Sequence, residues 1–207
     1  MAVVRDGPHT LLFSDRRWTR PDGHESHTKI HASRGLIWAT AGAAAVRYRG
    51  EIRSTAGLIG AFLSEIADNG SFDLDELIQF LAPLVAADDR PGPTGVHVLL
   101  GRATAPPIYM FLPAKNGEIG WEEIEHGRII PSPHTVGYFG SYFPDDRFFP
   151  PRGSSPHEIM EFMCPMLEEA IAYAQETAGP DNSDVAGPID VAIVNPGGGG
   201  QILKESI

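Results

Sequence analysis

The stretch Leu11-Leu12-Phe13-Ser14-Asp15-Arg16-Arg17-Trp18-Thr19 decides the fold. Its apolar half predicts a buried β-strand, and its polar half places a carboxylate and two guanidinium groups where that strand ends. Two further strands are predicted at residues 29–31 and 36–40, and the small residues 41–45 after them indicate close backbone packing. The N-terminal third is therefore expected to be β-structure with charged groups gathered where a strand ends.

Upstream of that stretch, residues 2–4 form another apolar run. The turn signal Asp6-Gly7-Pro8 separates this run from the strand at 10–13. We expect a hairpin here, with a loop slightly longer than the minimal two residues. A second turn is predicted at Pro21-Asp22-Gly23.

Three amphipathic helices are predicted. Residues 55–67 and 73–87 carry apolar side chains at helical spacing. The third helix begins at Ser155-Pro156 with a capping Ser and a Pro at the first helical position, and it extends to about Thr177. Pro165 is expected to bend it.

The remaining segments predict more β-structure. The order of strands, two helices, strands, one helix and strands suits an α+β fold, a four-layer αββα sandwich with two antiparallel sheets between helices. No composition change marks a boundary, so residues 1–207 are expected to form a single domain. These later strands are predicted at 96–100, 108–112, 120–124, 129–130, 135–139, 189–194 and 201–203.

Composition excludes several classes of protein. The net charge is −11, with 27 acidic against 16 basic residues, which argues against nucleic-acid binding. No run approaches the roughly 20 apolar residues of a membrane span, and the first residues have no secretory signal pattern. The single cysteine, Cys164, excludes an internal disulfide and fits a reducing compartment. A soluble cytoplasmic protein is expected.

Neither a metal nor a cofactor is expected. His24, His27 and His31 lie close in sequence, but no Cys pair or His-Glu-x-x-His pattern accompanies them, so surface histidines are the favoured interpretation. The glycines at 197–200 precede a strand rather than a helix, which favours a hairpin turn over a phosphate-binding loop. Cys164 falls inside an amphipathic helix and is interpreted as a core residue.

Taken in order, these segments resemble the proteasome β-subunit and related bacterial proteasome-like proteins of the N-terminal-nucleophile (Ntn) hydrolases. The resemblance rests on the 11–19 stretch, Lys29-Ile30 and the strand 36–42 ending in Ala-Gly. Residues 187–194, with the glycine turn after them, are similar to the family's penultimate strand. The helix pair between these blocks has the family's order, so the resemblance covers nearly the whole chain.

The resemblance implies a catalytic role for three charged residues. In such enzymes an N-terminal Thr, Ser or Cys attacks a carbonyl and its own α-amine acts as the base, tuned by a lysine that an acid holds in place. Lys29 would be that lysine, Asp15 its acidic partner and Arg17 a neighbouring structural charge. The alternative is that the same three residues form a buried ion network that holds the hairpin, and both interpretations stay open.

Three departures from the family pattern argue against catalysis. Met1 and Ala2 stand near the nucleophile position, and neither can attack a carbonyl. Val185 replaces an expected serine, and residues 137–141, with bulky rings, replace the Gly-Ser-Gly loop. We therefore expect a non-catalytic, ring-forming homologue, a pseudoenzyme. The alternative is an active threonine-type peptidase or amidohydrolase whose true N-terminus differs from Met1.

The resemblance also implies partners. These folds associate in rings through their helical faces, so a homo-oligomer is expected. A peptide or small-molecule ligand could bind in the cleft between the sheets, lined by the aromatic segment 138–149. That segment could equally form an oligomer contact or a packed loop.

Overall fold

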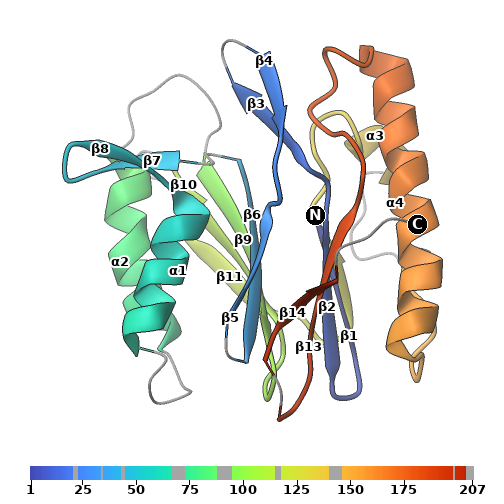
Figure 1. Cartoon of the computed structure of the whole chain (residues 1–207), viewed down its shortest axis with the longest axis horizontal. Coiled ribbons are helices and arrows are strands. Elements are labelled where there is room, and N and C mark those ends of the chain that lie inside the picture. Colours follow the sequence, from blue (N-terminus) through green and yellow to red (C-terminus); the bar gives the residue numbers. More distant parts are fainter. Residues whose placement is uncertain are drawn as a thin grey trace.

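The computed structural model describes residues 1–20, 23–33, 35–42, 45–66, 73–87, 95–114, 118–139, 146–197 and 199–203. Two five-stranded sheets face each other, with helices on the two outer sides (Figure 1). The mixed α/β class predicted from the sequence is confirmed. No helix in the described part of the chain is long and apolar enough to cross a membrane.

The first sheet contains the first and the last strand of the described residues. Its strand order is β12-β1-β2-β13-β14, and every neighbouring pair is antiparallel. β2 lies at its centre, between β1 and β13, which explains its continuous apolar sequence. The strands are β1 (Ala2–Asp6), β2 (His9–Ser14), β12 (Gly127–Ile129), β13 (Asp190–Val194) and β14 (Gln201–Leu203).

The second sheet has the order β11-β10-β9-β6-β5, again antiparallel throughout. Two small hairpins, β3–β4 and β7–β8, stand outside both sheets. The strands are β5 (Ile30–Ser33), β6 (Leu36–Gly42), β9 (Gly95–Arg102), β10 (Ile108–Pro113), β11 (Gly120–Glu123), β3 (Arg17–Arg20), β4 (Gly23–Ser26), β7 (Ala45–Tyr48) and β8 (Glu51–Ser54).

The helices cover the outer faces of the sheets (Figure 1). α1 (Thr55–Ile66) and α2 (Leu74–Ala86) pack on the second sheet, and α4 (Pro156–Ala178) packs on the first. Ser155 and Glu158 form the full capping box at the start of α4, as its sequence predicted. α4 runs on through Pro165. The short helices are α3 (Val136–Phe139) and η2 (Asp146–Phe148).

Strand alternation sends successive β2 side chains to different cores. Leu11 and Phe13 join the cluster under α4, whereas Leu12 joins a cluster that also contains Ile37 and Leu99 of the second sheet. Neighbouring side chains on a strand point to opposite faces, so both faces of the first sheet are buried. The continuous apolar run that predicted a buried strand is thereby explained.

Two sequence predictions about turns and strands were wrong. The β1–β2 hairpin has the minimal two-residue turn, because Asp6 pairs directly with His9 and Gly7 adopts a φ of +52°. Residues 135–139 do not form a strand. Ser132 accepts hydrogen bonds from the backbone of Thr135 and Val136, and this turn begins the helix α3 instead.

The aromatic segment does not line the space between the sheets in its described part. Phe139 and Phe149 are buried in the cluster under α4, and Tyr138 and Phe148 pack against that cluster. Cys164 is buried in the same cluster, as predicted. Residues 140–145, together with the predicted turn residues Pro21 and Asp22, lie outside the described residues.

Truncating Leu12 should destabilise the protein strongly, because its fully buried side chain contacts the opposing sheet. We expect Leu12→Ala to lower the free energy of unfolding by about 2–5 kcal/mol. Ile52→Ala, at a side chain that is 61% exposed, should change it by less than about 0.5 kcal/mol. Urea denaturation of both variants checks this, and equal losses would contradict the assignment of Leu12 to the inter-sheet core.

Candidate functional site

An ion pair joins the two sheets at one end of the sandwich. Asp15 directly follows β2 of the first sheet, and Lys29 directly precedes β5 of the second. The Lys29 Nζ lies 2.9 Å from each carboxylate oxygen of Asp15. The two side chains are only 13% and 9% exposed, so the pair is shielded from water. The structure thus brings together two of the three predicted site residues.

Arg17 supports this pair without joining it through its side chain. Its backbone N–H donates to the Asp15 carboxylate at 3.0 Å. Its guanidinium instead donates to the backbone carbonyls of Pro180 and Asp181, in the loop after α4. Arg17 therefore anchors that loop and helps to orient Asp15.

Arg16 has a role that the sequence did not predict. Its guanidinium forms an ion pair with Asp190, a fully buried residue at the start of β13. The hydrogen bond to Asp190 raises the pKa of Arg16. The two arginines after β2 thus have different partners. Arg16 binds Asp190 of β13, and Arg17 binds the loop between α4 and β13.

The amino group of Met1 lies close enough to Asp15 and Lys29 for both charges to affect its pKa. It donates to the Ile130 carbonyl at 3.1 Å, and the Met1 carbonyl accepts from the Ile130 N–H at 2.8 Å. Burial, assisted by the nearby Lys29 charge, lowers the pKa of this amine from 8.0 to about 6, against the opposing effects of Asp15 and Asp184. Such an amine is largely neutral at pH 7 and can accept a proton.

The loop after β12 also lies at this end of the sheet, because Ile130 pairs with Met1. Ser132 and Thr135 exchange hydrogen bonds within it, and His134 Nδ1 lies 2.9 Å from the Asp184 carboxylate. In the described part of the 137–141 stretch, Gly137 belongs to α3, where a side chain would collide with Tyr173 of α4. Residues 140 and 141 lie outside the described residues.

Four serine and threonine hydroxyls near this site have hydrogen-bond partners. Ser14 Oγ donates to the Asp15 carbonyl, and the fully buried Ser183 Oγ donates to the Val185 carbonyl. Ser132 and Thr135 bind each other. These contacts shape turns.

The described residues offer no cluster of three His, Cys, Asp or Glu side chains that could hold a metal ion. His27 and His31 are described, whereas the side chain of His24 is not. His31 stacks on Trp38, with ring centroids 5.6 Å apart, and is therefore half-buried rather than a surface histidine. Burial lowers the pKa of His31.

Replacing one partner of the Asp15–Lys29 pair should lower the free energy of unfolding more than replacing both partners. We expect Lys29→Met to lower the free energy of unfolding by about 3–5 kcal/mol, because it leaves the Asp15 carboxylate shielded and unpaired. The double variant Lys29→Met/Asp15→Asn should recover part of that loss. Urea denaturation of the two single variants and the double variant measures the coupling. Strictly additive losses would show that the pair contributes nothing as a pair.

Protein whose first residue is Met1 should gain stability as the pH rises from 6 to 8. Across this range the unfolded amine, with a pKa of 8.0, binds more protons than the folded amine, with a pKa of about 6. The folded state is therefore favoured increasingly with pH, by on the order of 2 kcal/mol in all. Urea denaturation at pH 6, 7 and 8 checks this. An N-acetylated control should lack this contribution, and an identical profile from it would contradict the assignment.

Solved structures resemble the chain although sequence comparisons do not find relatives: no family model and no curated protein matches it. BPH from Thiobacillus denitrificans, in complex with epoxomicin, shares 13% identity over 94% of this chain and 97% of its own, with a TM-score of 0.52. Eukaryotic HslV from Trypanosoma brucei shares 16% over 94% and 98%, with a TM-score of 0.50. Anbu, an ancestral β-subunit from Yersinia bercovieri, shares 14% over 94% and 81%, with a TM-score of 0.56. The chain therefore has the fold of these proteasome-type structures.

Proposed function

We propose that the chain is a non-catalytic, ring-forming subunit of the proteasome type, built as one four-layer αββα domain and working in the cytoplasm. The observation that carries the proposal is the identity of the residues beside the Asp15–Lys29 pair. Met1 occupies that place, and neither Met1 nor Ala2 has a hydroxyl or a thiol. Neither of these two residues can therefore attack a carbonyl.

The hydrogen bonds around the pair favour a structural role. Both oxygens of Asp15 lie within 2.9 Å of Lys29, and one of them also accepts from the Arg17 backbone. Lys29 bridges the two sheets at a nearly buried position, where such a pair defines how the sheets align. Such a structural role does not depend on a nucleophile.

The second candidate is an active peptidase or amidohydrolase with a Thr, Ser or Cys at a different N-terminus. The place of the Met1 amine favours it, because burial there lowers the pKa of an α-amine, and a neutral α-amine at that place is the base that such a nucleophile needs. The positive charge of Lys29 would keep that amine neutral, and Asp15 would hold Lys29 in place. Arg17 would orient Asp15 through its backbone N–H.

Intact mass and N-terminal sequencing of the protein from its native host separate the two candidates. We expect a chain that begins at Met1 or Ala2, forms no adduct with epoxomicin and does not hydrolyse fluorogenic peptides. Lys29→Ala serves as the matched control. For a non-catalytic subunit it leaves the background signal unchanged, whereas for an Ntn hydrolase it abolishes activity.

A chain that begins with Thr, Ser or Cys and hydrolyses peptides in a Lys29-dependent way would overturn the non-catalytic assignment. Light scattering tests ring formation separately. We expect a mass of several subunits, and a strictly monomeric peak would remove the ring from the proposal while leaving the catalytic question intact.

A further inference from the structure

The end of the sandwich opposite the Asp15–Lys29 pair holds a second polar site. Along β1 and β2 the side chains that face the second sheet alternate with those that face α4, so Val3 and Leu12 belong to the inter-sheet core. Arg5 and Thr10 are the next residues in the same two rows, and they pair across the hairpin. Arg5 lies about 13 Å along β1 from Met1, with the dry core of Val3 and Leu12 between them.

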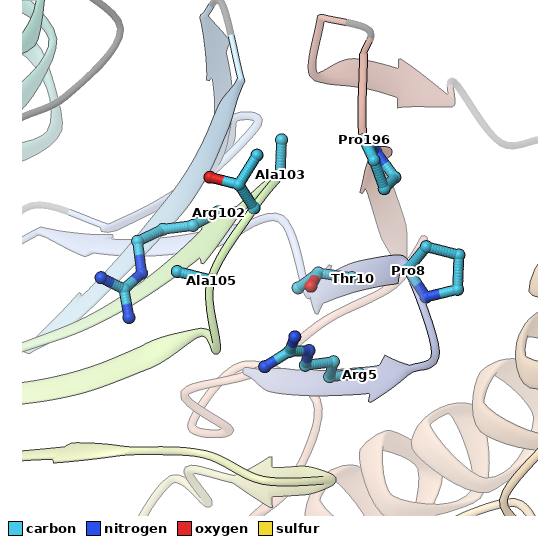
Figure 2. A pocket seen from close by; sticks show the side chains of 8 residues that line it. Arg5, Pro8, Thr10, Arg102, Ala103, Ala105 and Pro196 are labelled. Atoms are coloured by element: carbon cyan, nitrogen blue, oxygen red, sulfur yellow. The ribbon is translucent and has the colours of Figure 1, made fainter.

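A cavity of about 330 Å³ opens at this position. Figure 2 shows Arg5 and Thr10 on the β1–β2 hairpin, facing the segment of the second sheet that carries Arg102, Ala103 and Ala105. The cavity therefore lies between the two sheets, and both contribute to its wall. Its lining consists of Arg5, Pro8, Thr10, Arg102, Ala103, Thr104, Ala105 and Pro196.

The two arginines of the lining differ in their partners. Arg102 donates to the Pro106 carbonyl at 2.7 Å and to the Glu123 carboxylate at 2.6 Å, so its guanidinium is held in place. The guanidinium of Arg5 has no hydrogen bond or ion pair to any described residue, although Arg5 is half-buried. A partly buried guanidinium without a counter-charge loses hydration and gains nothing in return.

The rest of the lining also suits an anion. No acidic residue lines the cavity, although the chain as a whole has a net charge of −11. Thr10 and Thr104 add two hydroxyl groups, and the hydroxyl of Thr10 makes no hydrogen bond to the described residues. A guanidinium is a planar donor that binds carboxylate or phosphate through two parallel hydrogen bonds.

We propose that this cavity binds a small molecule with an oxyanion group, a phosphate or a carboxylate, with Arg5 as the main ligand-binding residue. Its volume lies at the small end of ligand pockets. Arg5 and Thr10 would bind the anion from the first sheet and Arg102 from the second. The bound ligand would tie the sheets together, so it would stabilise the folded chain.

Thermal unfolding and isothermal titration with inorganic phosphate test the proposal, at an ionic strength held constant with NaCl. A parallel titration with citrate distinguishes a phosphate site from a carboxylate site. We expect saturable binding of one of the two anions and a rise in the midpoint of unfolding. No saturable binding of either anion would overturn the proposal.

Arg5→Gln should weaken binding by about ten- to a hundredfold, since it removes a charged hydrogen-bond donor. Arg47→Gln is the matched control, because it makes the same charge change at an exposed residue on β7 and should bind like the wild type. Ala105→Glu places a carboxylate in the cavity wall and should abolish binding while the protein stays folded. If Arg5→Gln does not fold, the anion affinity of Ala105→Glu tests the proposal by itself. Wild-type affinity in either cavity variant would overturn the assignment.

Discussion

The burial of both faces of the first sheet is the constraint on which the rest of the structure depends. β2 has α4 on one side and the second sheet on the other, and its residues from Thr10 to Ser14 are all buried. Charged side chains cannot be placed in the middle of such a strand without a large desolvation cost. They are therefore confined to its two ends. Asp15 lies at one end, and Arg5 of the neighbouring strand β1 lies at the other. The polar chemistry of the sandwich is divided between two sites for this reason.

The Asp15–Lys29 pair shows how such an end is stabilised. A nearly buried ion pair contributes little net stability compared with apolar residues of similar size, but losing one partner is costly. Once the pair exists, each partner therefore constrains the other. The same logic applies to Arg16 and Asp190, whose contact ties the end of β2 to the start of β13. Retention of these charges follows from folding and does not require catalysis.

The local features of the fold were predictable from sequence. Each of these features can be recognised from a few consecutive residues. They are the apolar run ending at Phe13, the strand that begins near Asp190 and the capping box at Ser155. The Asp15–Lys29 contact was predicted only through the resemblance to proteasome-type proteins. Nothing in the spacing of the two residues, 14 positions apart, requires them to meet.

The long-range parts of the site could not be predicted. The pairing of Met1 with Ile130 joins residues 129 positions apart, and it brings the 131–134 loop to the site. The contact between His134 and Asp184 spans 50 positions. The short helix α3 was missed because the hydroxyls of Ser132 and Thr135 bind the local backbone, and a hydrophobic pattern does not register that competition.

The β7–β8 hairpin outside the two large sheets has a similar explanation. β7 and β8 are joined by Arg49 and Gly50, both with positive φ, and this turn lies between strands with few buried side chains. A sequence pattern detects a strand through its buried face, so a largely exposed hairpin is hard to recognise. The sequence pattern therefore missed β7 and β8, where few side chains are buried, and detected β2, which is covered on both faces.

The two polar ends of the sandwich differ in how their charges are neutralised. At the Asp15–Lys29 end, the carboxylate and the ammonium neutralise each other, and the contact between the sheets is complete within the chain. At the Arg5 end, the second sheet brings Arg102 to the same cavity, and its one acidic partner there, Glu123, pairs with Arg102 rather than with Arg5. Glu123 offsets Arg102, but no described side chain offsets Arg5. A bound anion between Arg5 and Arg102 would supply the missing negative charge at this end. It would then play the part that the Asp15 carboxylate plays for Lys29 at the other end.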